Sequence, residues 1–473
     1  MKKIISVLLI ISMMIIAMPS FMYINASEPS GTAITTAEEF KNMKATGRYY
    51  LANDITVSEV YSKTFYGVLN GNGHSITIQN IKYLFTRVSG ILENLTVKGS
   101  ISLSSDTEAA GVALYAGSES VDTAVVTFKN VTSRVNITAS GYATQTKPIG
   151  GIVAMLNKGE ITFTQCKNYG NISINTSGVA SGNVGGIAGK TVGSSSVTFS
   201  SCINEGALTS TQKNLQIGGM LAYFEALDYG GTEVTVSLEK CTNRGAITAC
   251  SDTHMGVGGM IGCIYNKGSS KAATTIKGCK NEGKILAKGS AVSFDVGGMV
   301  GRSYAVPNLK LEDCTNSADI DASIASSWSG AGGMIGNIMT ISTAWSWSNI
   351  AKSTHIVNNC MNTGTIRGLQ TGGIVGAGMQ LGTKDIVISF NSCVNVGNVY
   401  GNDYTGGIFG VAGLHDGREN FGNLTFNACY NAGYVKGLNA SAGILGYMAG
   451  SNTATSIVTK FDSCVNTGTI KCK

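Results

Sequence analysis

The sequence predicts an all-β fold, a right-handed parallel β-helix of about 10–12 rungs with a short capping helix at its N-terminal end. Three observations predict it: a unit that recurs through most of the chain, short β-branched segments inside each unit, and turn residues between them. The 473 residues include 62 glycines and only 4 prolines. We divide the chain into a signal peptide at 1–26, an N-terminal cap with the first rungs at 27–100, and a repeat solenoid at 101–473.

Each copy of the unit is centred on a cysteine and on an asparagine two residues later. Large apolar residues stand three positions before the cysteine and six positions after it, as Phe163 and Ile172 do around Cys166. The nine cysteines are Cys166, Cys202, Cys241, Cys279, Cys314, Cys360, Cys393, Cys429 and Cys464. The nine asparagines are Asn168, Asn204, Asn243, Asn281, Asn316, Asn362, Asn395, Asn431 and Asn466. Successive cysteines are 33 to 46 residues apart, a period that indicates a solenoid, a propeller or an array.

The internal pattern of the unit selects the solenoid. Each copy has three short apolar segments: one with a glycine pair, as in Gly185-Gly186-Ile187, one leading into the cysteine, and one leading out of it. No copy has the 3.6-residue periodicity of a helix, and a propeller blade needs four antiparallel strands. Three strands per copy fit one rung of a β-helix, in which equivalent residues stack at ~4.8 Å. The apolar positions then form a continuous core.

The asparagine and the glycine two residues after it suit a turn. Asparagine tolerates left-handed backbone, glycine takes positive φ readily, and stacked amides can bond to one another along the axis. The glycine is present in eight of the nine copies, and we expect an altered turn at the exception, Ala318.

Nine of the twelve cysteines would lie in one column of the solenoid. Neighbouring cysteines in such a column could reach disulfide distance, but parallel Cβ vectors do not suit the ~90° disulfide dihedral. We therefore expect free thiols that act as small buried apolar groups, with disulfides between successive copies as the alternative. Cys250, Cys263 and Cys472 lie outside the column.

The first 26 residues have the pattern of a secretory signal peptide. Lys2 and Lys3 precede an apolar run, Pro19 interrupts it, and the small residue Ala26 offers a cleavage point. The alternative is an uncleaved anchor, because the apolar run is just long enough to span a bilayer. No second stretch of spanning length follows, so we expect a secreted or cell-surface protein with no other membrane segment.

The composition argues against nucleic acid as a partner. Charged residues make up 13% of the chain, and the net charge is only +6. We find no basic stripe and no nucleic-acid-binding motif. With 43% hydrophobic residues, the chain is also unlike a disordered one.

A capping box precedes the solenoid. Thr36 and Glu39 are spaced to bond each other's backbone at the start of a helix, which predicts a helix over about residues 37–44. A helix there could cover the open end of the solenoid. Residues 126–138 form a degenerate copy of the unit, with Val131 in the cysteine position.

The segment from Gly67 to His74, Gly-Val-Leu-Asn-Gly-Asn-Gly-His, and the later Gly-Gly-Ile-x-Gly repeats resemble bacterial GLUG-motif proteins over about residues 35–473. The resemblance implies a secreted or surface right-handed β-helix, and the motif also occurs beside IgA-specific metallopeptidases. Those peptidases imply a zinc site, but this sequence has no His-Glu-x-x-His motif, so we expect neither a metal nor a cofactor. The chain has four histidines, far apart in sequence: His74, His254, His355 and His415.

The three tryptophans, Trp328, Trp345 and Trp347, all fall in one copy of the unit. That copy has the longest segment between its glycine pair and its cysteine: the cysteine stands 27 positions after the second glycine, against 15 to 22 elsewhere. Insertions in solenoids form loops that are often on the binding face. Trp345 and Trp347 alternate, so an extended loop would present both on one face, which suits a sugar or protein surface. The alternative is that the tryptophans pack the loop onto the solenoid.

A catalytic centre is not evident in the sequence. A glycosidase needs two carboxylates about 5–9 Å apart, and no column of Asp or Glu recurs through the copies. The densest cluster of ionisable residues, from His415 to Glu419, is interpreted as a solvated loop. We therefore predict an adhesin-like binding or spacer module whose partner is a glycan or a host or cell-surface protein. The alternative is a carbohydrate-active β-helix enzyme, or an accessory region of a larger secreted peptidase.

The last copy stops within its third segment, at Lys473. A bare terminal rung offers unpaired backbone groups and apolar surface. We therefore expect either a fragment of a longer protein or end-to-end association with another chain.

Overall fold

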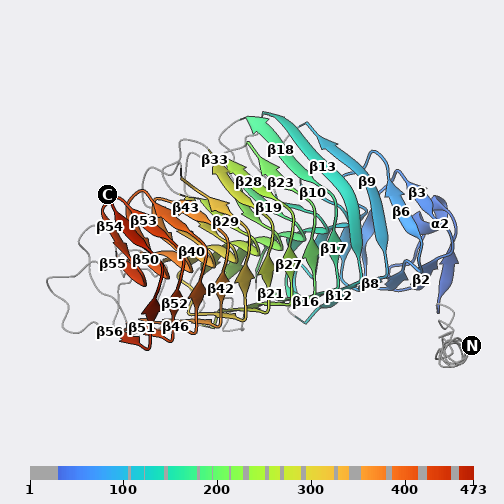
Figure 1. The fold of residues 1–473 in the computed structure, drawn as a ribbon. Helices are drawn as coiled ribbons and strands as arrows, with labels where there is room; N and C mark the ends of the chain where they lie inside the picture. Colours follow the sequence, from blue (N-terminus) through green and yellow to red (C-terminus); the bar gives the residue numbers. More distant parts are fainter. Residues whose placement is uncertain are drawn as a thin grey trace, which may run out of the picture.

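The computed structural model of this chain is a solenoid of long parallel sheets, and each copy of the repeat adds a strand to each sheet (Figure 1). The first described strands and the C-terminal strands lie at opposite ends of the stack. The structure describes residues 30–104, 108–121, 123–142, 148–177, 182–193, 195–211, 215–226, 234–250, 255–266, 271–288, 294–323, 329–339, 353–379, 386–413, 423–448 and 458–473. The predicted signal peptide lies outside them. Within them, no helix is long and apolar enough to cross a membrane.

One regular copy contains five strands rather than the three that the sequence predicts. In the copy of Cys202 they are β19 (Gly182–Gly185), β20 (Ala188–Thr191), β21 (Ser195–Ser200), β22 (Ile203–Asn204) and β23 (Leu208–Ser210). The glycine pair separates the first two strands, and the turn after the asparagine separates the last two. Two of the three predicted segments are therefore bent in the middle, which the apolar pattern alone does not reveal.

Each strand pairs in parallel with its counterpart in the next copy, as β21 does with β16 and β26. Sheet D has ten strands: β10 (Ala109–Ala110), β14 (Ile149–Gly150), β19, β24 (Leu215–Gly218), β29 (Met255–Gly258), β34 (Phe294–Gly297), β39 (Gly330–Gly332), β44 (Gln370–Gly372), β49 (Tyr404–Gly406) and β54 (Ala440–Ala442). Sheet C has twelve: β4 (Tyr61–Phe65), β7 (Phe85–Val88), β11 (Ala113–Ala116), β15 (Val153–Leu156), β20, β25 (Leu221–Ala226), β30 (Ile261–Asn266), β35 (Val300–Tyr304), β40 (Ile335–Met339), β45 (Val375–Met379), β50 (Phe409–Ala412) and β55 (Leu445–Met448). Sheet A has fourteen: β1 (Thr32–Ile34), β2 (Arg48–Leu51), β5 (Val68–Asn70), β8 (Ile91–Glu93), β12 (Val125–Lys129), β16 (Gly159–Thr164), β21, β26 (Thr235–Glu239), β31 (Ala273–Lys277), β36 (Asn308–Glu312), β41 (Ser353–Asn358), β46 (Ile386–Asn391), β51 (Asn423–Asn427) and β56 (Thr459–Asp462).

The strands after the cysteine form sheet B, in which β22 and β23 occupy separate files. In the degenerate copy, β13 (Thr132–Tyr142) runs unbroken through both positions and pairs with β17 (Lys167–Asn168) and β18 (Ile172–Ser177). Its Ser133 stands opposite Asn168, where the later copies have asparagine. The division of sheet B thus begins with the first asparagine of the series.

Columns of equivalent apolar residues fill the interior. Phe128, Phe163 and Phe199 are in register on sheet A and stack with ring centroids 4.8 and 4.9 Å apart. Phe426 and Phe461 stack in the same way at 5.0 Å near the other end. One core cluster therefore runs along the solenoid, as the repeat predicts.

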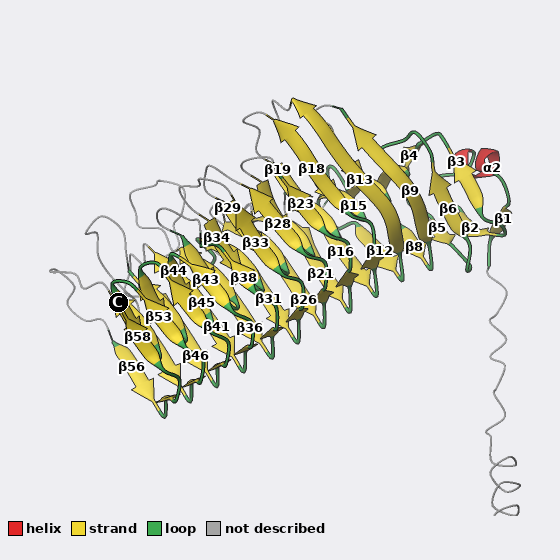
Figure 2. Cartoon of the chain, turned by 45° about the horizontal axis from the view of Figure 1, so that its top comes forward, coloured by secondary structure: helices red, strands yellow, loops and turns green. Residues whose placement is uncertain are grey.

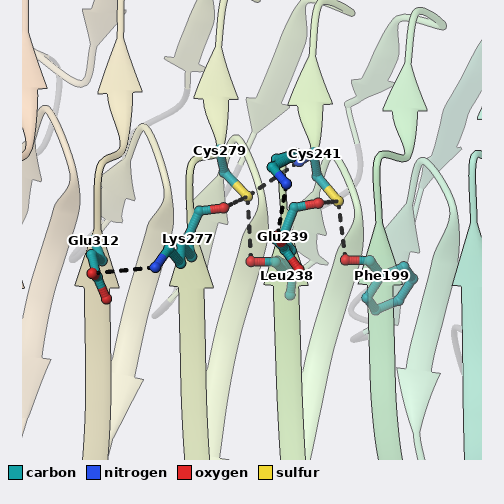
Figure 3. Close-up of polar contacts among 8 residues, drawn as sticks. Phe199, Leu238, Glu239, Cys241, Lys277, Cys279 and Glu312 are labelled. Carbon is teal, nitrogen blue, oxygen red and sulfur yellow. Dashed lines mark hydrogen bonds and ion pairs between the residues drawn. The ribbon is translucent and has the colours of Figure 1, made fainter.

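The nine repeat cysteines are free thiols that lie inside the turn between sheets A and B. All are buried except Cys464, in the last copy, which is half-buried. Most of these thiols bond to the previous copy: the Cys241 thiol donates to the Phe199 carbonyl at 3.4 Å, and the Cys279 thiol to the Leu238 carbonyl at 3.6 Å (Figure 3). The thiols therefore pair with backbone carbonyls that would otherwise be costly to bury.

The asparagine column is a hydrogen-bonded ladder inside the solenoid. Each Nδ2 donates to the Oδ1 of the next asparagine, from Asn168 to Asn466, over 2.6 to 2.9 Å. The same Nδ2 donates to the carbonyl two residues on, as from Asn204 to Gly206 at 3.0 Å. Each side chain also packs against a glycine bend: a Cβ on Gly186 would lie 2.5 Å from Asn204.

The predicted backbone conformation of this turn is wrong in two respects. The left-handed residue is the one before the cysteine, such as Gln165 and Ser201, both with φ of 55°. The glycine after the asparagine does not take positive φ; it is required because a Cβ on Gly206 would lie 2.0 Å from the Gly170 carbonyl oxygen. At Ala318 the Asn316 amide still donates to the carbonyl, at 2.8 Å, so that bond of the turn is kept.

At the N-terminal end, α2 (Ala37–Lys41) begins with the predicted capping box (Figure 2). The Thr36 hydroxyl accepts from the Glu39 amide at 3.2 Å, and the Glu39 carboxylate accepts from the Thr36 amide at 3.1 Å. The helix is shorter than predicted because only Phe40 among its residues is buried. That ring packs edge-on against Tyr61 and Phe85 of sheet C.

Candidate functional site

Sheets D and C meet at the glycine pair of each copy, and side chains from their outer faces contact each other there. Val296 of β34 is in the core, so Asp295 beside it in the extended strand points to the opposite face. Asp295 forms an ion pair with Arg302 of β35, in sheet C of the same copy. Tyr404 of β49 stacks on Tyr447 of β55, in sheet C of the next copy, with ring centroids 4.2 Å apart. The two outer faces therefore turn toward each other and bury most of the side chains between them, with Asp295, Asn337, Ala377 and Val411 at most 1% exposed. We call this region the C/D corner.

The side chains of the C/D corner change from copy to copy. In sheet C the aligned outward positions hold Lys190, Tyr223, Cys263, Arg302, Asn337, Ala377, Val411 and Tyr447. In sheet D they hold Gln216, Gly256, Asp295, Gly330, Gln370 and Tyr404. This variation is unlike the cysteine and asparagine columns, which keep one residue type through nine copies.

The last glycine of the Gly-Gly-x-x-Gly motif lets the two sheets approach at the corner. A Cβ on Gly301 would lie 2.3 Å from the backbone nitrogen of Val257, in sheet D of the preceding copy. A Cβ on Gly336 would lie 2.4 Å from the backbone nitrogen of Val296. Both distances are too short for a carbon, so the motif glycine is a packing requirement of the corner.

Asp295 is the centre of a buried polar cluster at the corner. Its carboxylate accepts from the Gly330 amide and from Asn337 Nδ2, both at 3.1 Å, as well as from Arg302 Nε. Arg302 is 12% exposed, and Asp295 is fully buried. A buried charge is tolerated only when it is paired and hydrogen-bonded, and this carboxylate meets both conditions.

The groups around Arg302 keep it charged. Burial disfavours its charged form, but the Asp295 carboxylate beside it holds the pKa of Arg302 above its ordinary value. Burial raises the pKa of the neighbouring Cys263 thiol to about 12, so this thiol is neutral at physiological pH. Among the described residues only Asp295 bonds to the guanidinium, through Nε, and the terminal Nη atoms make no described bond.

Next to the corner, three half-buried tyrosines, Tyr223, Tyr265 and Tyr304, form a stacked row on the outer face of sheet C that we call the tyrosine strip. Their successive ring centroids are 6.3 and 4.7 Å apart. Lys190 lies 5.1 Å from the centroid of Tyr223 and forms an ion pair with Glu225 at 2.9 Å. Burial raises the pKa of Tyr223 and of Tyr304, so their hydroxyls stay protonated and can donate hydrogen bonds.

The chemistry of this surface suits contact with a neutral polar ligand. Its two ion pairs, Lys190–Glu225 and Asp295–Arg302, each cancel their own charge. The tyrosines offer apolar ring area with a hydroxyl at the end, a combination that is frequent at interfaces. No group of three or more His, Cys, Asp or Glu in the described part of the chain is arranged to hold a metal ion.

The residues singled out in the sequence are not among the described residues of the C/D corner. Trp328, Trp345 and Trp347 lie outside the described residues, as does the cluster from His415 to Glu419. The repeat cysteines and asparagines line the core, so their place is structural. Sequence reasoning missed the C/D corner because it searched for residues that recur, and the corner residues do not. The available signal was the fourth residue after each glycine pair, a position where charged, aromatic and small residues all occur.

Comparison with known proteins adds little beyond the fold. No protein-family model and no curated protein matches the chain. Among solved structures, the chain is similar to a crystal structure titled as a "putative immunoglobulin A1 protease" from Bacteroides ovatus, with 17% sequence identity and a TM-score of 0.38. The match covers 63% of this chain and 79% of that one.

Proposed function

We propose that this protein is a secreted or cell-surface β-solenoid of the GLUG-motif type that acts as an adhesin-like binding module. Its ligand is an extended glycan or a cell-surface protein that lies along the tyrosine strip and contacts the partly exposed residues of the C/D corner, Lys190 and Arg302. The observation that carries the proposal is the contrast between columns: the cysteine and asparagine columns repeat one residue, whereas the aligned positions on the other face of sheet C differ from each copy to the next. A module that served only as a spacer would not need different side chains at equivalent positions of its copies.

The energetics of the corner support a binding role over a pure spacer. Replacing a buried ion pair with apolar residues of similar size is often neutral or stabilising, so stability alone does not account for Asp295 and Arg302. Held by Asp295 through Nε, Arg302 keeps its terminal nitrogens for another partner. A preorganised guanidinium beside Tyr304 is a suitable anchor for a ligand's oxygen atoms.

The carboxylate of Asp295 supports binding over acid–base catalysis. Three donors already occupy its oxygens, and a general acid or base must reach the substrate directly. A carbohydrate-active enzyme would instead use a second carboxylate within reach of the same bond. Incubating the protein with the glycan that it binds, and measuring new reducing ends, separates the enzyme alternative from the binding module.

The test is a glycan and cell-surface protein array probed with the mature form, from residue 27 onward. Tyr265→Ala and Tyr304→Ala should each weaken the array signal about tenfold or more, because each removes a central aromatic contact. Tyr66→Ala is the matched control, because this tyrosine is 59% exposed and lies outside the strip. Equal signals from the strip variants, the control and the parent protein would show that the strip does not bind the ligand.

A further inference from the structure

An open cavity of about 230 Å³ lies where three successive copies turn from sheet C into sheet A. It follows the C-terminal ends of β11, β15 and β20. The cavity is lined by Ser118, Glu119, Asn157, Lys158, Val192 and Gly193. It is separate from the tyrosine strip, which occupies the outer face of later strands of the same sheet.

A buried arginine holds one wall of the cavity in place. Arg87 donates through Nη1 to the Gly117 carbonyl at 3.2 Å and through Nη2 to the Glu119 carboxylate at 2.5 Å. Its guanidinium lies over the Tyr115 ring, 4.5 Å from the centroid. The Glu119 side chain is 77% exposed, yet its carboxylate is fixed at this end. The second oxygen of Glu119 therefore faces a possible ligand, while Arg87 balances the charge of the carboxylate.

Glycine backbone shapes the same walls. Gly117 has φ of 96° and Gly193 has φ of 84°, a region that side chains rarely adopt. A Cβ on Gly193 would also lie 3.3 Å from Lys158 Cγ. Val192, 36% exposed, offers an apolar side chain beside this open turn.

A second acceptor beside the cavity has no hydrogen-bond partner among the described residues. It is Asn157 Oδ1, which is buried and unpaired there. Each such buried polar atom requires an explanation, because leaving it unpaired destabilises the fold. Rotation of the Asn157 amide toward the cavity would let a ligand hydroxyl supply the missing bond.

We propose that this cavity binds one ring of a neutral sugar residue, an inference that rests on the glycan ligand of the proposed function. Asn157 Oδ1 and the second oxygen of Glu119 are both acceptors, which suits hydroxyl donors rather than a carboxylate. Lys158, the cation among the lining residues, already has an interaction of its own. Arg87 already neutralises Glu119, so a cationic ligand gains little from it. Val192 provides apolar surface for the carbon–hydrogen face of the ring, as small-molecule sites usually do.

The first test is saturation-transfer NMR with the mature protein and separate solutions of glucose, galactose, mannose and N-acetylglucosamine. Glucuronic acid and glucosamine serve as the anionic and cationic probes. We expect transfer to at least one neutral sugar and weaker or no transfer to its charged counterparts. Transfer to none of the neutral sugars, or stronger transfer to a charged one, would overturn the proposal.

The second test locates the site with three variants. Asn157→Ala should weaken binding of the neutral sugar about tenfold, the loss expected for one hydrogen bond to a buried acceptor. Val192→Trp should fill the cavity and abolish binding. Glu160→Gln, an exposed change on the adjoining β16, should leave binding unchanged. Thermal unfolding of each variant confirms that it is folded.

The outcomes separate this proposal from the proposed function. If Asn157→Ala and Val192→Trp are folded and bind the sugar as tightly as the parent protein, the cavity is not the site, whatever the array shows. If these variants lose the single sugar while Tyr304→Ala retains it, the cavity is an independent subsite. A failed array with a positive cavity test would reject the strip and keep the cavity.

Discussion

The asparagine column and the C/D corner are built on the same copies of the repeat but follow opposite rules. In the column, each amide must match the amides above and below it, so one residue type persists from Asn168 to Asn466. In the corner, each side chain meets partners from the other sheet, as Arg302 meets Asp295. The first arrangement permits no variation and the second permits a great deal. In this solenoid, repetition therefore marks structure, and variation on a contacting surface marks the candidate site.

The largest effect should come from breaking the ion pair of the corner. Arg302→Leu leaves the fully buried Asp295 carboxylate without its countercharge, and we expect a loss of about 3–5 kcal/mol in the free energy of unfolding. The double variant Asp295→Asn with Arg302→Leu removes both charges and keeps an oxygen for the Gly330 amide. It should recover at least half of that loss. Denaturant titration checks both, and equal losses in the single and double variants would contradict the ion-pair account.

A slightly smaller effect is expected inside the ladder. Asn281→Ala removes the acceptor of Asn243 and the donor to Asn316, and it leaves the Gly283 carbonyl without its side-chain bond. We expect a loss of about 3 kcal/mol, since each buried group left unpaired costs about 1–3 kcal/mol. The matched control is Asn466→Ala in the last copy, which removes one ladder bond at an exposed position.

Equal losses of stability in these two alanine variants would contradict this prediction, because an interior position of the ladder would then contribute no more than its last position. The same denaturant titration measures both. A near-zero effect of Asn281→Ala would show that water replaces the missing amide.

His355 is an ionisable residue in a core column whose neighbouring members are apolar. It stands in register between Leu309 and Ile388, and its Nε2 is 2.8 Å from the Ser353 hydroxyl. Burial lowers its pKa to about 4, from an ordinary value near 6.5. Between these values the unfolded chain binds the proton and the folded chain does not. Stability should therefore be complete above pH 6.5 and fall by about 3 kcal/mol as the pH drops to 4.

The control for this pH dependence is His355→Leu, which restores the apolar column. Unfolding free energies of both proteins, measured from pH 7 to pH 4, should diverge as the pH falls, with the variant the more stable at the acid end. Parallel curves would mean that other groups set the acid sensitivity.

The limits of the sequence analysis follow the same division between repeated and varied positions. The parallel β-solenoid could be predicted because Cys202, Asn204 and their counterparts recur, and recurrence at this period reports stacking. Which residue takes the left-handed backbone could not be predicted, because Ser201 and its equivalents share no residue type. The position of the C/D corner could not be predicted either. The motif glycines indicate bends, but the direction of each bend emerges only from contacts such as that of Gly301 with the backbone of Val257.

The smallest effect on stability is expected from the tryptophans of the longest insertion. Trp345 and Trp347 lie outside the described residues, so their role stays a prediction: if the ligand reaches the 337–355 segment, these rings contact it. Replacing both with alanine should then reduce ligand binding about tenfold while the free energy of unfolding changes by no more than about 0.5 kcal/mol, as for substitutions away from the core.

The companion measurement is Tyr304→Ala in the same binding assay, because it separates a ligand that follows sheet C from one that stays on the loop. Loss of binding in both variants indicates one ligand that spans the strip and the loop. Loss in the tryptophan variant alone would move the site off the C/D corner. A fall of several kcal/mol in the unfolding free energy of the tryptophan variant would instead show that the rings pack the loop onto the solenoid, since removing large buried rings costs about 3–5 kcal/mol.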